Sequence, residues 1–156
     1  MIHIQIPGSR DLTIENILLD FNGTLAVDGR LIEGVRERIA QFSDCLNFHV
    51  ITADTFGSVK KELEELHCFV HIIPEQDQAS SKLSYLQKLG PENTIGVGNG
   101  ANDERMLQEA VLGVAVLGQE GLATKTLMAS NLAVNHILDL FAYFEKPDRL
   151  IACLRE

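Results

Sequence analysis

The sequence predicts an α/β fold of the Rossmann-like type, a three-layer, doubly wound parallel sheet with helices on both faces. Short, continuous apolar runs alternate along the chain with segments in which apolar residues recur at helical spacing. Several of the apolar runs end in Asp, Thr or Gly, as buried strands that lead into loops do. No internal repeat, low-complexity tract or linker divides the 156 residues, so we expect one domain over residues 1–156.

A β-hairpin is expected before the main sheet. Residues 2–6 alternate between Ile and polar side chains, Pro7-Gly8-Ser9 turns the chain, and residues 12–14 return as the second strand. The run Ile17-Leu18-Leu19 then suits a strand that is buried on both faces, and this strand ends at Asp20.

After Asp20 helices and strands alternate, which predicts parallel strands with crossover helices. The C-terminal apolar residues at 137–154 are expected to pack on the sheet as core, with a subunit interface or a partial lid as the alternative. Helices are expected over 32–42, 58–67, 80–89, 103–110, 122–128 and from 137 to the end, and strands over 48–51, 68–73, 94–97, 111–116 and 132–134.

The charge balance excludes several classes of partner. Thirteen Lys and Arg against 22 Asp and Glu give a net charge of −9, and no basic cluster offers a face for nucleic acid or for an anionic membrane. No apolar run approaches the roughly 20 residues that span a bilayer. The scattered Cys45, Cys68 and Cys153 suggest buried thiols in a reducing compartment, and we expect a cytoplasmic protein without membrane insertion.

Oxygen-bearing side chains follow three of the predicted strands. Asp20 ends the first, Thr52 ends the second, and the segment 98–103 follows the strand at 94–97 with two glycines and Asp103. Because parallel strands deliver their carboxyl ends to one edge of the sheet, these groups are expected to meet there. Oxygen ligands of this kind suit Mg²⁺, and loop amides suit a phosphate group. The metal and the amides would supply the positive field that an acidic chain needs in order to bind an anion.

Lys82 is the candidate cation for this site. It lies near the start of the helix that precedes the strand at 94–97, so it can project over the same edge, whereas Lys88 lies at the far end of that helix.

At these positions the sequence resembles the haloacid dehalogenase-like phosphohydrolase superfamily, and within it the soluble relatives of the P-type ATPase phosphorylation domain. The superfamily motifs D-x-D-x-T, T-G-D, a lysine and G-D-G-x-N-D stand here in that order. The matching residues, between about 17 and 134, are Asp20-Phe21-Asn22-Gly23-Thr24, Thr52-Ala53-Asp54, Lys82 and Gly98-Asn99-Gly100-Ala101-Asn102-Asp103.

The resemblance implies a role for each of these residues. Asp20 would be the nucleophile that forms an aspartyl-phosphate, with Thr52 and Lys82 completing the catalytic set. Phosphate would be bound by residues of the three loops, and Mg²⁺ by carboxylate, carbonyl and amide oxygens. The phosphate-binding candidates are Asn22, Gly23, Thr24, Ala53, Asp54 and Asn102, and the metal candidates are Asp20, Asn22, Asn99 and Asp103.

Two residues depart from the superfamily pattern. Asn22 stands where ordinary phosphatases have the aspartate that protonates the leaving group and activates water, and an amide cannot exchange a proton near pH 7. P-type ATPases also lack this aspartate. Asn99 replaces a metal-binding aspartate, so metal affinity should fall. The expectation is a slow Mg²⁺-dependent phosphatase.

Two other functions stay open on the sequence. The first is a catalytically degenerate binding or regulatory domain, and the second is a phosphoryl-accepting partner subunit. The short segments after Thr24 and after residue 73 leave no room for a cap domain. Capless members resemble enzymes for large substrates or oligomers whose neighbours close the site, so the expected partners are a phosphorylated small molecule or a phosphoprotein, and a homo-oligomer stays open.

Overall fold

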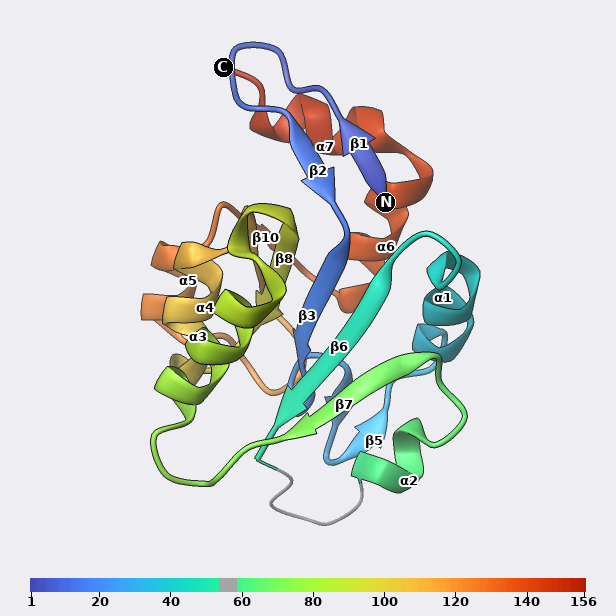
Figure 1. Ribbon diagram of the computed structural model, residues 1–156, viewed down its shortest axis with the longest axis vertical. Coiled ribbons are helices and arrows are strands. Elements are labelled where there is room, and N and C mark those ends of the chain that lie inside the picture. The colour runs from blue at the N-terminus through green and yellow to red at the C-terminus, as the bar shows by residue number, and fades with distance from the viewer. Residues whose placement is uncertain (54–58) are drawn as a thin grey trace.

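The computed structural model describes residues 1–53 and 59–156, and its centre is a parallel sheet (Figure 1). The strand order is β10-β9-β8-β3-β6-β7, and every neighbouring pair is parallel. The predicted doubly wound α/β fold is therefore confirmed. The strands are β3 (Asn16–Asp20), β6 (Asn47–Thr52), β7 (Cys68–Ile72), β8 (Thr94–Gly98), β9 (Leu112–Val116) and β10 (Leu132–Val134).

The order of the strands predicts a ligand-binding crevice beside β3. The chain moves from β3 to β6 and β7 on one side, then returns to β8, β9 and β10 on the other side. Connections that leave a central strand in opposite directions open a crevice at the carboxyl ends of the strands, where ligands bind in such sheets. Asp20 is the last residue of β3 and therefore lies at this crevice.

Helices cover both faces of the sheet because the buried strands are apolar on both sides. In β3, Ile17 and Leu19 belong to the core under α1 and α6, whereas Leu18 belongs to the core under α3 and α4. Figure 1 shows α3, α4 and α5 together on one side of the sheet, with α1 and α6 on the other. The helices are α1 (Val35–Phe42), α2 (Val59–Leu63), α3 (Gln78–Leu89), α4 (Glu104–Glu109), α5 (Thr124–Ala129), α6 (Ile137–Glu145) and α7 (Pro147–Leu154).

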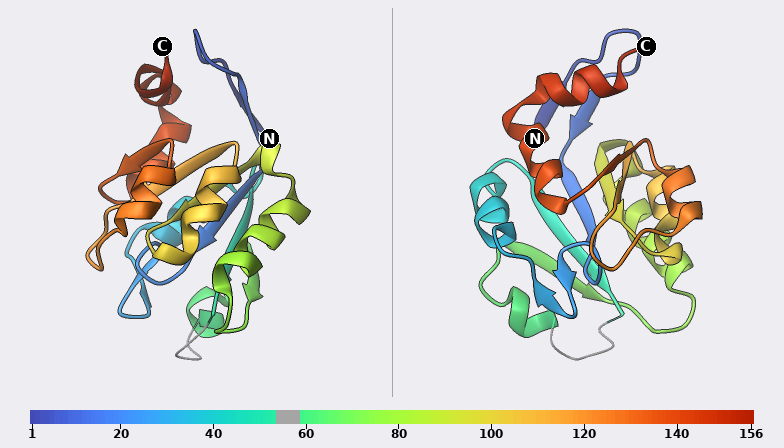
Figure 2. Two further views of the ribbon diagram at one scale, coloured as in Figure 1. Left: turned by 90° about the vertical axis from the view of Figure 1, so that its left-hand side faces the viewer. Right: turned by 180° about the vertical axis from the view of Figure 1, so that it is seen from behind.

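The two ends of the chain pack together away from the crevice. Strands β1 (Ile2–Ile4) and β2 (Leu12–Ile14) form the predicted antiparallel hairpin, which lies beside α7 (Figure 2). Phe141 and Phe144 of α6 and Leu150 of α7 are buried in the same core as the hairpin. The C-terminal segment is therefore core, as expected, rather than a lid over the strand ends.

Several boundaries differ from the sequence prediction. The region after Thr24 contains a second small hairpin, β4 (Ala26–Val27) and β5 (Arg30–Leu31), whose turn at Asp28 and Gly29 has positive φ at both residues. Glycine and aspartate tolerate that conformation. The helix predicted over 32–42 begins three residues later, at Val35, because residues 32–34 form a loop and turn that follow the hairpin. Helix α2 ends earlier than predicted, since residues 64–65 form a turn and residues 66–67 a bend.

The cysteine prediction was only partly right. Cys45 and Cys68 are half-buried, but Cys153 is exposed, because it lies on the outer face of α7. All three are free thiols. In the described ranges, no helix has the length and apolar character needed to cross a membrane.

Candidate active site

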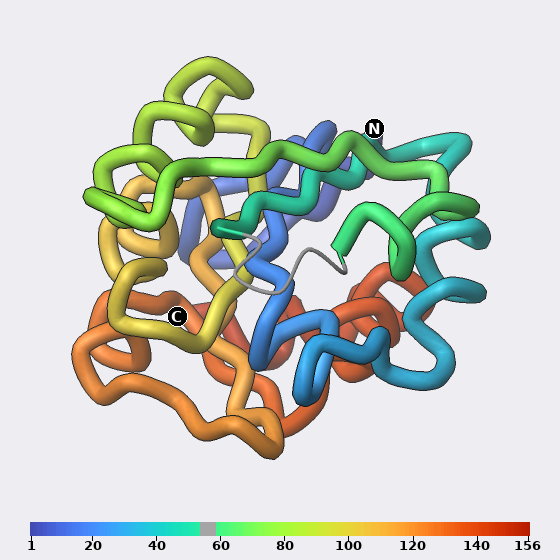
Figure 3. The backbone as a smooth tube through the Cα atoms, turned by 90° about the horizontal axis from the view of Figure 1, so that it is seen from below, coloured from blue at the N-terminus to red at the C-terminus, as the bar shows by residue number. Residues whose placement is uncertain are grey.

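Loops from several strands converge at the carboxyl edge of the sheet, which Figure 3 views end-on. The segments after β3 and β8 lie side by side there because those strands are neighbours. Lys82 comes from the second turn of α3, which crosses back over the sheet between β7 and β8.

Lys82 is the centre of a buried ion cluster. Its Nζ donates hydrogen bonds to Asp20 Oδ1 at 2.7 Å and to Asp103 Oδ1 at 2.6 Å. The lysine is 1% exposed and Asp103 is fully buried. A lysine is almost never buried to this degree unless it is paired, and here two carboxylates pair with it.

Asp103 also organises the loop that follows β8. Its second oxygen, Oδ2, accepts hydrogen bonds from the backbone N–H groups of Asn99 at 3.0 Å and of Gly100 at 2.9 Å. A side chain at position 98 would place its Cβ 2.4 Å from Asp103 Cγ, so glycine is required there. Both oxygens of Asp103 are therefore used, one by Lys82 and one by the loop.

The electrostatics of the cluster follow from burial and from its two negative charges. Burial and the neighbouring Asp103 raise the pKa of Asp20 to about 7, although the Lys82 ammonium opposes this shift. Burial by itself would lower the pKa of Lys82, but Asp20 and Asp103 outweigh it and raise that pKa. When Asp20 and Asp103 are both ionised, their two negative charges exceed the one positive charge of Lys82.

The loop after β3 is a tight turn closed by backbone hydrogen bonds. Phe21 O accepts hydrogen bonds from the N–H groups of Thr24, Leu25 and Ala26, and Gly23 has a φ of 80°. A Cβ on Gly23 would lie 2.3 Å from Asn99 Nδ2, so this turn fits against the loop of β8 only with glycine. Asn22, two residues after Asp20, is half-buried, and within the described ranges no side-chain hydrogen bond holds it.

Asn99 joins the two loops. The buried Thr24 hydroxyl donates to Asn99 Oδ1 at 3.3 Å, and Asn99 Nδ2 donates to Gly121 O at 3.0 Å. Asp20, Lys82, Asp103, Asn99 and Thr24 thus form one continuous hydrogen-bonded series. The structure brings together these predicted residues from three separate motifs.

The residues fit Mg²⁺ by the chemistry of their donors. Carboxylate, amide and main-chain carbonyl oxygens are available at this edge, and a dication would offset the excess negative charge. Across residues 1–53 and 59–156, however, no three His, Cys, Asp or Glu side chains are arranged to hold a metal. A bound Mg²⁺ would therefore depend on Asp20, on Asn99 and on the Asn22 carbonyl, together with waters and phosphate oxygens.

The other predicted site residues are not part of this hydrogen-bonded series as the structure describes it. Thr52 is buried at the end of β6, next to β3, and Ala53 packs against the core under α3. Asp54 lies outside the described residues. Asn102 is half-buried, and its Nδ2 donates to Gln78 Oε1 at 2.5 Å. Its place in a phosphate site stays a prediction.

Two residues of this network were missed in the sequence. Gln78 holds Asn102, and the Thr126 hydroxyl donates to Gly100 O at 2.6 Å. Gln78 could have been found, because it precedes Lys82 by four residues and so shares its helix face. No local pattern marks Thr126, which comes from α5, after β9.

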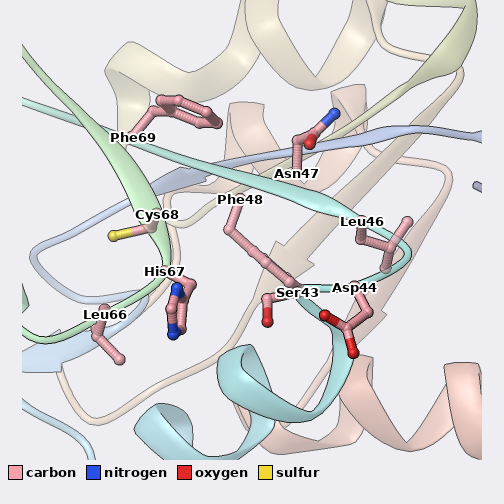
Figure 4. A pocket seen from close by; sticks show the side chains of 9 residues that line it. All are labelled: Ser43, Asp44, Leu46, Asn47, Phe48, Leu66, His67, Cys68 and Phe69. Atoms are coloured by element: carbon pink, nitrogen blue, oxygen red, sulfur yellow. The ribbon is translucent and has the colours of Figure 1, made fainter.

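A cavity of about 440 Å³ lies at the opposite edge of the sheet (Figure 4). Its walls come from the end of α1 and from the amino ends of β6 and β7, with Phe48, His67 and Cys68 among the lining residues. The β6 and β7 strands therefore separate it from the Lys82 cluster.

The fold is that of the haloacid dehalogenase-like hydrolases, here without a cap domain in the described residues. A haloacid dehalogenase-like hydrolase from Bacillus subtilis superposes with a TM-score of 0.58 at 12% identity, covering 92% of this chain and 93% of that one. The 3-deoxy-D-manno-octulosonate 8-phosphate phosphatase of Moraxella catarrhalis, solved with magnesium and phosphate ions, gives 0.64 at 19% identity, covering 91% and 94%. The corresponding Haemophilus influenzae phosphatase, in its cobalt-bound form, gives 0.68 at 10%, covering 91% and 90%.

Sequence comparison identifies close relatives in an archaeon. Uncharacterized protein MJ0073 of Methanocaldococcus jannaschii is 39% identical over 80 residues, which are 49% of this chain and 86% of that protein. Uncharacterized protein MJ0072 of the same organism is 46% identical over 39 residues, 25% of this chain and 89% of that protein. The chain belongs to the family of these two proteins.

A third relative has a much longer chain. The human protein named probable phospholipid-transporting ATPase IM is 29% identical over 110 residues, which are 68% of this chain and 8% of the ATPase. No protein-family model matches the chain.

Proposed function

We propose that this protein is a Mg²⁺-dependent phosphohydrolase that works through an aspartyl-phosphate on Asp20. The observation that carries the proposal is the buried Lys82, whose ammonium bridges Asp20 and Asp103 at the carboxyl edge of the sheet. A cluster that costs desolvation energy, in the crevice where such folds bind ligands, favours a functional role over a purely structural one. The fold, shared with phosphatases, supports the same reaction class.

The reaction proceeds in two displacements. A carboxylate oxygen of Asp20 attacks phosphorus, and the bond between phosphorus and the leaving-group oxygen breaks. Water then attacks the phosphorus, the bond to Asp20 breaks, and phosphate leaves with the carboxylate restored. Lys82 offsets negative charge on Asp20 and on the transferring group, and Asp103 fixes the ammonium in position. When bound, Mg²⁺ would supply positive charge to the phosphoryl oxygens.

Asn22 makes both displacements slow. An amide can donate a hydrogen bond but cannot give a proton to the leaving group or take one from water. Loss of general acid–base help lowers a rate by about 10²- to 10⁴-fold. The leaving-group proton must come from solvent, so substrates with good leaving groups, such as aryl phosphates, are favoured.

The direct test is Mg²⁺-dependent hydrolysis of p-nitrophenyl phosphate. The wild type is expected to turn over slowly and Asp20→Asn not at all. Asp44→Asn, the same chemical change at an exposed site on the opposite edge, serves as the matched control and should retain the wild-type rate. Equal rates for the wild type and Asp20→Asn would overturn the proposal.

The class of substrate is proposed from the lack of a cap domain in the described residues. Because the described residues include no cap, we propose a phosphorylated small molecule or a phosphoprotein, with a second copy of the chain able to complete the site in a homo-oligomer. Free Cys45, Cys68 and Cys153 suit a reducing, cytoplasmic setting.

A second candidate function is a binding or regulatory domain without turnover. Asn22 and Asn99 favour it, because each is an amide where the resembling enzymes carry a carboxylate. The similarity to the ATPase supports a related variant, a phosphoryl-accepting partner subunit. A chain that binds Mg²⁺ but neither hydrolyses phosphate esters nor gains a phosphoryl group would favour the binding domain.

A further inference from the structure

The loop that carries Asn99 is held from the side of α5 as well as from the side of Asp103. Ala123 N, directly before α5, donates to Asn99 O at 2.8 Å, and the Thr126 hydroxyl donates to Gly100 O at 2.6 Å. Asp103 Oδ2 binds the N–H groups of the same two residues, Asn99 and Gly100. The backbone N–H and the backbone carbonyl of both Asn99 and Gly100 are therefore held by hydrogen bonds. The hydrogen bonds from Ala123 and Thr126 on one side, and to Asp103 on the other, form a clamp on Asn99 and Gly100.

Within this clamp the Thr126 side chain, unlike that of Asp103, makes no hydrogen bond with Lys82 in the ion cluster described above. It is fully buried, on a helix of which most residues are exposed, and its hydroxyl spans the distance between α5 and the loop of β8. A buried threonine hydroxyl costs free energy unless it is hydrogen-bonded. Valine would fill the same volume at this position without that cost, so a role in packing alone does not account for the hydroxyl.

We propose that Thr126 is a positioning residue for the metal and phosphate site. It acts through the Gly100 carbonyl, which fixes the turn that presents Asn99 and keeps Asp103 aligned on Lys82. The proposal rests on the proposed function, since it assigns to this loop a share in binding Mg²⁺.

The neutral ligand Asn99 explains why such a clamp matters. An amide oxygen attracts Mg²⁺ through its dipole alone, so its affinity depends on being held in the correct orientation before the metal arrives. Partners that orient the ligands of a metal typically contribute about 10- to 100-fold in affinity or activity. Thr126 would contribute through the backbone of the residue next to Asn99.

Three variants test the assignment. Thr126→Val keeps the volume and removes the hydrogen bond, while Thr126→Ser restores the hydroxyl. Thr124→Val makes the same chemical change two residues away on α5, at an exposed position, and is the matched control. Denaturant unfolding of all four proteins shows which remain folded, and Thr126→Ser keeps the test valid if Thr126→Val unfolds.

The first readout needs neither metal nor activity. Hydrogen exchange of the peptide that spans residues 98–103 reports on the bonds of the Asn99 and Gly100 amides to Asp103. Exchange should be at least about tenfold faster in Thr126→Val, and unchanged in Thr126→Ser and Thr124→Val. If the amides of Thr126→Val exchange at the wild-type rate, the proposal is overturned, whether or not the protein is a phosphatase.

The second readout is the Mg²⁺ dissociation constant, measured calorimetrically together with kcat and KM for p-nitrophenyl phosphate. Thr126→Val should bind Mg²⁺ roughly tenfold more weakly, and Thr126→Ser should restore the affinity. An unchanged Mg²⁺ affinity in a folded Thr126→Val would overturn the positioning role. Suppose that the loop amides exchange faster in Thr126→Val but the wild type binds no Mg²⁺. The structural role of Thr126 in holding the loop is then supported, whereas its link to metal binding and the proposed function are both overturned.

Discussion

The Lys82 ammonium lies 2.7 Å from the Asp20 carboxylate, although 62 residues separate the two in the sequence. Asp103 contacts the same ammonium from the loop of β8. Strand β3, helix α3 and the segment after β8 must therefore all be in place before the cluster can form. A change at Lys82 is therefore expected to affect both the free energy of unfolding and the reactivity of Asp20.

Lys82→Met is expected to lower the free energy of unfolding by about 3–5 kcal/mol, because it leaves two buried carboxylates without their cation. Denaturant unfolding at neutral pH measures this loss. Lys88→Met, on the same helix but exposed, is the matched control and should change stability by less than about 0.5 kcal/mol. Similar losses in the two variants would contradict the buried cluster.

Asn22→Asp is expected to raise phosphatase turnover. The new carboxyl would stand beside Asp20 and could protonate the leaving group and then activate water, a contribution of about 10²- to 10⁴-fold in favourable geometry. We expect a gain of at least about tenfold in kcat with p-nitrophenyl phosphate. An unchanged or lower rate in a folded variant that binds Mg²⁺ would show that Asn22 is not the reason for slow turnover.

Asn99→Asp is expected to bind Mg²⁺ more tightly than the wild type, by about tenfold or more, which corresponds to ~1.4 kcal/mol. A carboxylate adds charge where the amide offers only a dipole. The variant also loses the hydrogen bond from Asn99 Nδ2 to Gly121 O, so its stability without metal should fall.

Isothermal titration calorimetry with Mg²⁺ measures this affinity. Asn135→Asp adds the same charge at an exposed position just after β10, on the same edge of the sheet, and is the matched control. If the two variants gain equally, the effect is a general one of charge and Asn99 is not a ligand. Removal of Mg²⁺ with a chelator should abolish hydrolysis in every variant.

His49 is expected to make the fold less stable in mild acid. It is buried on β6, stacks on Phe69 and lies 3.1 Å from the Tyr85 hydroxyl, and burial lowers its pKa. The unfolded chain takes up a proton below about pH 6.5, which the folded protein resists, so stability is lost as the pH falls through and below that value.

The contribution of His49 is isolated by comparing the wild type with His49→Gln. Gln is neutral at every pH tested and can still accept a hydrogen bond from Tyr85. Between pH 7 and pH 5 the wild type should lose up to about 1.4 kcal/mol per pH unit more than the variant. Parallel pH profiles of the two unfolding free energies would contradict the assignment.

Much of the fold could be predicted because its signals are local. The apolar run at 17–19 and the turn at 7–9 mark β3 and the N-terminal hairpin directly, and the alternation of strands and helices implies the parallel sheet. The hairpin of β4 and β5 was missed because its strands have two residues each, too few for a periodic pattern.

The site could be predicted only in part for a related reason. Asp20 ends β3, Asp103 lies in the segment after β8, and Lys82 lies near the start of α3, so the topology brings all three to one edge of the sheet. Gln78 shares a helix face with Lys82 and could have been found from that spacing. Thr126 acts through a contact between elements that are distant in sequence, and its local context is not unusual. Tertiary packing, rather than sequence pattern, determines that Thr126 faces the Gly100 carbonyl.

The central claim is that Asp20 accepts a phosphoryl group, and intact-protein mass measurement after incubation with acetyl phosphate and Mg²⁺ tests it most directly. The account predicts a mass increase of one phosphoryl group in the wild type, mapped by peptide analysis to Asp20 and lost in Asp20→Asn. Asp44→Asn should be phosphorylated as the wild type is. A wild-type protein that stays unmodified, or a phosphoryl group that persists in Asp20→Asn, would contradict the account.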